Sequence, residues 1–169
     1  MLTDELRATR ETIVRDHFAD EIAQQWDDVL STFPHPRYEL IATGDEYVGD
    51  AAVRGYYTSS RTAFPDQRGE IIALRHSDDA VIVEFFLTGT HLGPFGAIPA
   101  TGSAFKVRMT AFFLFDGDEL TCERIYFDVL TLLKQLIGGL NLKNPRNWWL
   151  LARAANGASS NNLFGIKAG

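Results

Sequence analysis

The chain has 169 residues, of which 46% are hydrophobic and 22% are charged, and its formal net charge is −6. This length allows one domain with a substantial core, and the composition is that of a globular protein, not of a disordered one. The acidic charge without any basic cluster argues against nucleic acid as a partner. A single cysteine, Cys122, excludes a disulfide framework and a cysteine-based zinc site. Residues 1–16 are charged throughout, unlike a secretory signal, and no apolar run approaches roughly 18 residues, so we expect a cytoplasmic protein without a membrane partner.

The N-terminal part of the chain is predicted to be mainly helical. Thr3 can cap a first helix whose apolar stripe ends at Phe18, and a second helix is expected over 20–32. The prolines that follow end this helix, because a residue before proline avoids the α conformation. A short strand at 38–41, a turn at 43–45 and a third helix at 51–63 complete this part.

The remainder of the chain is predicted to be mainly strands. Strands are expected at 70–75 and 80–91, and a Gly- and Pro-rich connection at 93–102 leads to a hairpin of two strands, 107–115 and 120–127. Asp116-Gly117-Asp118 provides the hairpin turn, and apolar residues then take helical spacing up to Ile137. Helices segregated from antiparallel strands indicate an α+β fold: a curved antiparallel sheet, shaped as a cone, covered by the N-terminal helices around a pocket. We expect this domain to span residues 1–137, followed by an extension at 138–169 with a short helix at 145–155 and a terminal tail.

Short motifs in the strand-rich part support a more specific interpretation. Three motifs resemble those of the SnoaL-like polyketide cyclases. The first is the string Gly89-Thr90-His91-Leu92-Gly93 with the glycines and prolines that follow it, and the second is the Phe-Asp-Gly-Asp turn at 115–118. The third is Asp128 followed by Leu132, Leu133, Gln135 and Leu136. The similarity covers about residues 8–137 and lies within the nuclear transport factor 2-like superfamily. It implies the cone fold and a pocket for a hydrophobic small molecule. The same cone hosts cyclases, hydrolases, dehydratases, isomerases and non-catalytic binders, so the fold alone does not select a reaction.

The family's catalytic positions carry different residues in this chain. The general base of SnoaL-like cyclases, an Asp on the last strand, aligns with Ile125, and the assisting His aligns with Thr110. Limonene epoxide hydrolases share the Tyr-Phe-Asp ending, and their catalytic Asp also aligns with Ile125. An alkyl side chain and an unactivated hydroxyl cannot accept a proton from carbon at neutral pH. The sequence therefore does not support either of these specific mechanisms.

Alternation along the strands offers a substitute set of polar groups. If Thr110 and Ile125 face the pocket, then Arg108 and Glu123 face it too, and Glu84 joins them from the neighbouring strand. An arginine between two carboxylates lowers the pKa of both and keeps them ionised, which suits binding of a polar substrate group. The alternative is a salt-bridge network without a catalytic role.

Four other ionisable residues each allow a functional and a structural interpretation. His91 lies at the expected pocket mouth, where an imidazole can act as acid or base, or can simply bond a loop carbonyl. Asp128 follows the last strand, and its simplest role is to cap the next helix; a catalytic role is the alternative. His17 and Glu21 are four residues apart on a helix, which is a spacing that metal ligands can have. The sequence offers no third ligand at a matching spacing, so we expect a solvated acidic face and no metal. The predicted substrate-binding residues are Trp26, Glu84, Thr110, Phe112, Ile125 and Tyr126.

Two functional hypotheses follow. The first is a cofactor-independent enzyme that cyclises, isomerises or dehydrates a polyketide-, steroid- or terpenoid-like molecule, with Glu123, Arg108, His91 and Asp128 as its catalytic groups. The second is a non-catalytic small-molecule-binding protein of the same shape. In either case a homodimer is expected, because one set of helices cannot cover both apolar faces of 81–87 and 107–115, and the superfamily commonly dimerises.

Overall fold

The structure is a computed structural model that describes residues 2–96 and 98–138, together with Lys143, Pro145, Trp148 and Ala152. Three helices belong to the N-terminal half: α1 (Asp4–Ala23), α2 (Trp26–Ser31) and α3 (Asp50–Ala63). Two short strands, β1 (Arg37–Leu40) and β2 (Asp45–Val48), lie between α2 and α3. The four long strands and a last helix follow as β3 (Arg68–His76), β4 (Ala80–Thr90), β5 (Ala104–Asp116), β6 (Glu119–Phe127) and α4 (Val129–Gly138).

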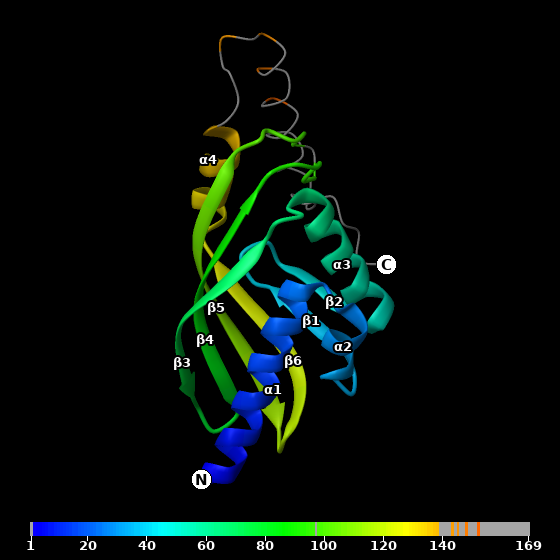
Figure 1. Ribbon diagram of the computed structural model, residues 1–169, viewed down its shortest axis with the longest axis vertical. Helices are drawn as coiled ribbons and strands as arrows, with labels where there is room; N and C mark the ends of the chain where they lie inside the picture. The colour runs from blue at the N-terminus through cyan, green and yellow to red at the C-terminus, as the bar shows by residue number, and fades with distance from the viewer. Residues whose placement is uncertain are drawn as a thin grey trace.

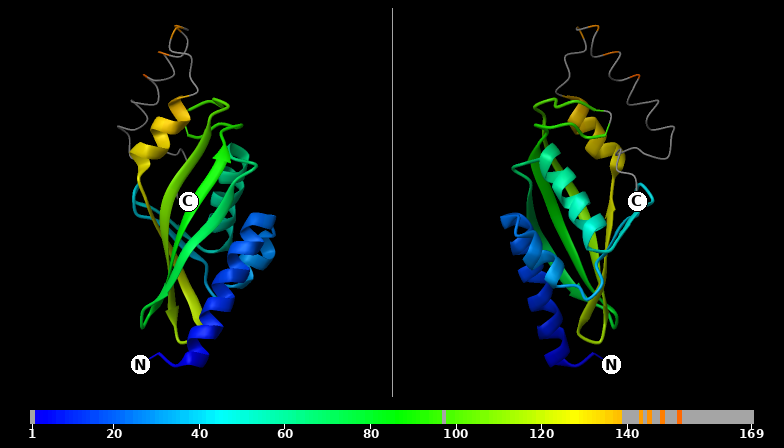
Figure 2. Two further views of the ribbon diagram at one scale, coloured as in Figure 1. Left: turned by 60° about the vertical axis from the view of Figure 1, so that its left-hand side comes forward. Right: turned by 90° about the vertical axis from the view of Figure 1, so that its right-hand side faces the viewer.

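The strands form one strongly bent sheet in the order β2-β1-β6-β5-β4-β3. Neighbouring strands are antiparallel except for β1 and β6, which are parallel. Helices α1, α2 and α3 cover the concave side of the sheet, and α4 lies at the end of the molecule opposite the N-terminus (Figures 1 and 2). The predicted α+β fold with a curved sheet under N-terminal helices is therefore confirmed.

Local signals explain where several elements begin and turn. The Thr3 hydroxyl accepts a hydrogen bond from the backbone N–H of Leu6 at 3.2 Å, as an N-cap does. Gly117 adopts φ +60° in the β5–β6 hairpin turn, a conformation that glycine takes without steric cost. Both features agree with the expectations from sequence.

Two elements differ from those expectations. The first helix continues to Ala23 and ends only where Gln24 takes a left-handed conformation at φ 60°, because no Gly or Pro breaks it near Phe18. Strand β2 was not expected at all. It forms because residues 45–48 pair with β1, which a four-residue segment by itself does not reveal.

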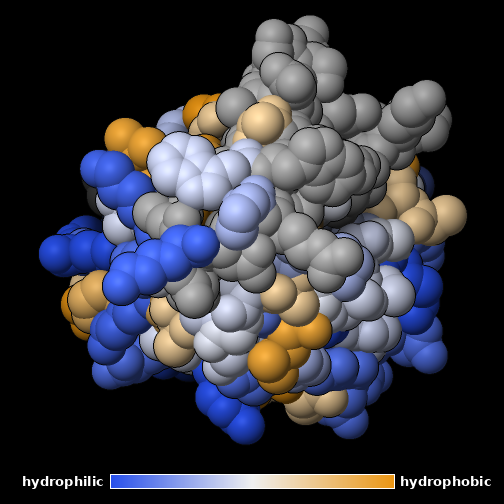
Figure 3. All heavy atoms as spheres, turned by 90° about the horizontal axis from the view of Figure 1, so that it is seen from above, coloured by the Kyte–Doolittle hydropathy of each residue, from blue (hydrophilic) through white to orange (hydrophobic). Residues whose placement is uncertain are grey.

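The core lies between the helices and the concave face of the sheet. Val14, Val53, Val83, Ala111 and Phe113 have no exposed surface, and they come from α1, α3 and the central strands. Viewed from above, the hydrophobic side chains at the described surface form small separate groups among polar ones (Figure 3). The division into a domain at 1–137 and an extension stays a prediction, and most of the expected helix at 145–155 lies outside the described residues.

Candidate functional site

A cavity of about 270 Å³ opens between the helices and the concave face of the sheet. Its walls are mainly aromatic and aliphatic, with Phe85, Leu87, Met109, Ile125 and Phe127 contributed by the sheet. Its polar lining residues include Glu21, Arg61, Gln67, Glu123 and the tyrosines Tyr38, Tyr47 and Tyr56. A mostly apolar hollow with a few convergent polar groups is the usual form of a small-molecule site.

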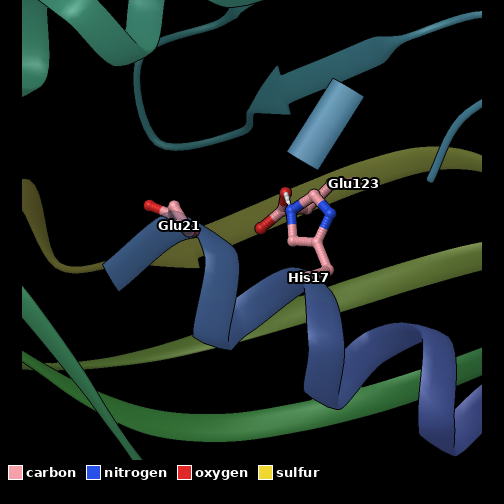
Figure 4. A group of neighbouring side chains, drawn as sticks. All are labelled: His17, Glu21 and Glu123. Carbon is pink, nitrogen blue, oxygen red and sulfur yellow. Dashed lines mark hydrogen bonds and ion pairs between the residues drawn. The ribbon is translucent and has the colours of Figure 1, made fainter. Parts of the chain in front are cut away.

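At one wall of the cavity, α1 and β6 bring His17, Glu21 and Glu123 together. His17 and Glu21 are one helical turn apart on α1, and Glu123 lies on the strand beside them (Figure 4). The imidazole Nε2 of His17 is 3.2 Å from Oε2 of Glu123, and both side chains are almost fully buried. Sequence spacing placed only the two helical residues side by side, since Glu123 is 106 positions away from His17.

The hydrogen bonds around His17 define the orientation of its ring. The Thr32 hydroxyl donates to the carbonyl of Val29 at 2.6 Å, so it accepts the N–H of His17 Nδ1 at 2.9 Å. Nε2 therefore faces Glu123. Burial by itself would lower the pKa of His17, but the hydrogen bond to Glu123 and its negative charge outweigh that effect and the pKa is raised. The imidazolium form, with both ring nitrogens donating, is thus favoured.

Glu123 is held from a second side. The Tyr57 hydroxyl donates to the same Oε2 atom of Glu123 at 3.3 Å. The Tyr57 ring stacks on Trp26 with 5.2 Å between ring centroids and an interplanar angle of 4°. Burial and the charge of Glu123 raise the pKa of Tyr57 well above its ordinary value, so the phenol remains a donor. Glu123 is accordingly fixed in position by charge and by two hydrogen bonds.

Glu21 has the electrostatic environment of an acid/base group. Burial and the nearby charge of Glu123 raise its pKa to about 7, against the opposing effects of His17 and Arg61. Its side chain retains 18% exposure and lines the cavity. The Arg61 guanidinium donates to the backbone carbonyls of Gln67 and Glu21 and lies 3.9 Å from the Glu21 carboxylate, too far for a direct hydrogen bond. Arg61 is therefore tied mainly to backbone, and Glu21 is left able to exchange a proton.

The same three side chains have the spacing of metal ligands. One donor atom each from His17, Glu21 and Glu123 lies within 4.8 Å of the others. Imidazole and carboxylate donors suit Zn²⁺ and other first-row metals, and the Thr32 contact to Nδ1 is the kind that orients a metal-binding histidine. The spacing argument from sequence missed this arrangement because the third donor comes from a distant strand.

The pairing of the central strands corrects the expected pocket set. Ile125 is opposite Ala111, and Thr110 is opposite Tyr126, so Thr110 and Ile125 point to different faces of the sheet. Ile125 and Glu123 line the cavity, whereas Arg108, Thr110 and Tyr126 lie on the outer face. The expectation that Thr110 and Arg108 face the pocket is therefore wrong, because it assumed that Thr110 and Ile125 share a face, and strand alternation carried that assumption to Arg108.

Glu84 and Phe112 also lie on the outer face. Glu84 is opposite Thr110 in the β4–β5 pair, where it forms ion pairs with Arg108 and, at 3.6 Å, with Arg75. The Phe112 ring packs against Tyr126 with 5.4 Å between centroids. The predicted contact between Glu84 and Arg108 exists, but as a partly exposed network outside the cavity.

Three further predicted residues have other surroundings. His91 is fully buried, and its Nδ1 forms a hydrogen bond with the Thr101 hydroxyl at 3.0 Å. It is not among the cavity-lining residues, and burial lowers its pKa. Asp128 is exposed and accepts hydrogen bonds from the N–H groups of Leu130 and Thr131, so it caps α4. Trp26 is half-buried behind Tyr57 and is not in the cavity wall either.

The bent sheet, the covering helices and the cavity between them define the nuclear transport factor 2 or ketosteroid isomerase-like class of α+β cones. The model of the SnoaL-like polyketide cyclase family matches residues 12–136, and the chain belongs to this family. No curated protein matches the chain. No helix within the described residues is long and apolar enough to cross a membrane.

Solved structures share the fold at low sequence identity. A candidate SnoaL-like polyketide cyclase from Jannaschia sp. CCS1 is 19% identical with a TM-score of 0.70, over 76% of this chain and 92% of that one. AclR, a candidate hydroxylase from Streptomyces galilaeus, is 20% identical with a TM-score of 0.66, over 79% and 98%. A protein from Catenulispora acidiphila with a ketosteroid isomerase-like fold, in complex with trimethylamine, is 19% identical with a TM-score of 0.63, over 73% and 91%.

Proposed function

We propose that this protein is an enzyme of the cyclase type that moves protons on a hydrophobic, polyketide-like small molecule, with Glu21 as its acid/base group. The observation that carries this proposal is the position of Glu21: a carboxyl group in the wall of an apolar cavity, with its pKa raised to about 7 by burial and by Glu123. A general acid or base is most effective when its pKa is close to the working pH. Family membership supports a small-molecule cyclase-type role.

The family's base position and the Glu21 carboxyl group lie at the same cavity but on different elements of the fold. The resemblance to the family assigns the base position to Ile125, which lines the cavity as an apolar side chain. Glu21 enters the same space from α1, and Glu123 lies two residues before Ile125 on β6. We propose that these carboxylates replace the missing aspartate.

The proposed step is a proton transfer at carbon. Ionised Glu21 takes a proton from a carbon next to a carbonyl group, and the electron pair of that C–H bond moves into the enolate. The protonated Glu21 then returns the proton to another atom of the substrate, which completes an isomerisation or prepares ring closure or loss of water. Glu123 stays in place between His17 and Tyr57, and its charge keeps the proton affinity of Glu21 high. We propose that this chemistry needs no cofactor.

Deuterium exchange tests the proposal without knowledge of the natural substrate. With 1-tetralone in D₂O, we expect the protein to accelerate exchange of the protons next to the carbonyl, followed by NMR. Glu21→Gln should reduce this acceleration at least about 100-fold, the usual contribution of a positioned acid or base. Glu11→Gln, on the same helix and paired with Arg15 and His76 instead of the cavity, is the matched control and should retain it.

Two further outcomes separate the alternatives. If 1-tetralone binds and the exchange rate equals that of buffer, the protein is the non-catalytic binder. If exchange requires added Zn²⁺ or Mn²⁺ and disappears with EDTA, the cluster of His17, Glu21 and Glu123 works as a metal site and the cofactor-independent proposal fails. We expect exchange to persist in EDTA.

A further inference from the structure

A chain of directed hydrogen bonds runs from His91, which follows β4, to helix α4. The Ser103 hydroxyl lies 2.9 Å from the backbone carbonyl oxygen of Leu136, and because a carbonyl oxygen can only accept, Ser103 donates there. Ser103 then accepts from the Thr101 hydroxyl at 3.1 Å, and Thr101 in turn accepts from Nδ1 of His91 at 3.0 Å. This order of donors places the proton of the neutral imidazole on Nδ1.

The other ring nitrogen of His91 is enclosed without a partner. His91 has no exposed surface, and within the described residues no donor or acceptor reaches its Nε2 atom. The rings of Phe64 and Phe95 pack against the imidazole, with 5.5 Å and 6.4 Å between ring centroids. Both phenylalanines also line the cavity, so His91 lies one layer behind the cavity wall. A buried polar atom without a hydrogen bond at such a place calls for an explanation.

A positive charge on His91 has no counter-ion. Among the described residues, no charged side chain contributes to the pKa of His91: burial lowers it, and the backbone of Gly93 raises it to a smaller extent. Asp66, in the loop after α3, accepts hydrogen bonds from the backbone N–H and the hydroxyl of Thr90 instead. Protonation therefore buries a charge and a new N–H donor among apolar rings, which is costly.

We propose that His91 is a pH-sensitive latch behind the cavity wall: its neutral ring holds Phe64 and Phe95 in place, and its protonation opens this wall and speeds the exit of a bound ligand. The inference goes beyond the proposed function, since it needs no proton transfer by Glu21. When the wall is open, water reaches Nε2 and His91 has its ordinary pKa of 6.5, whereas the closed state binds the proton less readily. The closed state is therefore favoured above pH 6.5, and this preference is lost as the pH falls below that value.

Hydrogen exchange of single amides, read by NMR on the full chain, tests the latch. The amides of Leu92 and Gly93 donate to the carbonyl of Ala63 at the end of α3, so they report opening of this wall. After correction for the intrinsic rate, we expect their exchange to accelerate about five- to tenfold from pH 7.5 to pH 5.5. The amide of Ala111, in the central strand β5, should not accelerate, because the raised pKa of Glu21 makes the whole fold more stable in acid.

Asparagine provides a matched variant at this position. In His91→Asn, the amide nitrogen can take the place of Nδ1 and donate to Thr101, but the side chain cannot be protonated, so the acceleration should disappear. His35→Asn replaces an exposed histidine and should retain the acceleration. Dissociation of 1-tetralone should accelerate by the same factor as amide exchange in the natural protein and stay constant in His91→Asn. A dissociation rate that is equal at both pH values in the natural protein would overturn the latch.

The imidazole signals of the natural protein give a test that needs no variant. With isotope-labelled histidine, we expect NMR to place the proton of His91 on Nδ1 at neutral pH and to give this ring a pKa below 6.5. A proton on Nε2, or a pKa of 6.5 or higher, would refute the inference. Acid-accelerated ligand exit in a protein that does not exchange deuterium into 1-tetralone would refute the role of Glu21 and leave the latch established.

Discussion

At the scale of single residues, the environment of Glu21 determines how strongly its carboxyl group holds a proton. Three ionisable side chains face it: Glu123 from β6, His17 from its own helix and Arg61 from α3. The nearest positive charges are engaged elsewhere, His17 with Glu123 and Arg61 with backbone carbonyls. Desolvation and like charge therefore outweigh attraction, and the carboxyl group retains its proton up to about neutral pH.

This raised pKa predicts a pH dependence of stability. Between the ordinary pKa of 4.5 and about 7, folded Glu21 binds a proton that the unfolded chain has released. The free energy of unfolding must then fall as pH rises through this window, by up to about 3 kcal/mol from this one group. Glu21→Gln carries no such proton, so we expect it to equal the natural protein at pH 4 and to exceed its stability at pH 8.

Urea unfolding at several pH values, followed by circular dichroism, measures this difference. Glu11→Gln again serves as the control, with the opposite sign. Its hydrogen bonds to Arg15 and His76 lower the pKa of Glu11, so the stability from Glu11 is present above 4.5 and is lost as pH falls below it. Parallel pH curves for the natural protein and Glu21→Gln would show that Glu21 ionises normally.

At the scale of elements, close contact between α3 and the β4–β5 connection positions one rim of the cavity. Gly93 donates its N–H to the carbonyl of Ala63 at 3.1 Å, and a Cβ atom at Gly93 would lie 2.1 Å from the carbonyl oxygen of Thr62. Pro94, Phe95 and Gly96, the next residues, line the cavity. The end of α3 and this loop are thus packed backbone against backbone, which only glycine permits.

Two glycine substitutions should therefore have opposite effects. We expect Gly93→Ala to destabilise the protein by about 1–3 kcal/mol, because backbone atoms must move to accept the methyl group. Gly55→Ala, in the middle of α3 with nothing within 4 Å of the added carbon, should stabilise it by about 0.5–1 kcal/mol. Thermal unfolding compares the two, and an unchanged midpoint for Gly93→Ala would contradict this packing.

At the scale of the whole molecule, the outer face of the sheet is not covered by any helix of the described chain (Figure 2). Phe112 packs on Tyr126 there, and Ile72 and Tyr126 are each 42% exposed. Charged side chains, among them Arg108 and Glu84, surround these apolar groups. An apolar centre inside a polar rim is typical of a protein interface, so we propose that this face pairs two copies of the chain.

This proposal predicts a dimer whose stability depends on Phe112. Light scattering after size exclusion should give twice the mass of one chain, and Phe112→Glu should give a single chain that keeps the cavity and its ligand binding. Leu130→Glu changes an equally apolar residue, 59% exposed on α4, and should leave the dimer intact. A natural protein that is monomeric at high micromolar concentration would refute the proposed pairing.

Most of the fold was predictable from local patterns. Helical and strand periodicity, proline and glycine positions and the order of elements led to the α+β cone, because these signals act within a few residues. The break expected near Phe18 and the missing β2 show where such signals are weak. Helix α1 continues past Phe18 because no Gly or Pro interrupts it there, and β2 forms only through its pairing with β1.

The site depended on contacts that the linear order does not contain. Strand alternation placed Glu123 and Ile125 on one face. The partner positions on β5 required the true register, and the assumption that Thr110 shares a face with Ile125 put Thr110, Arg108 and Glu84 on the wrong side. The sequence by itself determined the class of fold and the presence of carboxylates suited to acid/base chemistry. Only the tertiary structure decided that His17 and Glu21 meet Glu123 at one wall of the cavity, because burial and mutual charge arise when segments 106 positions apart are packed together.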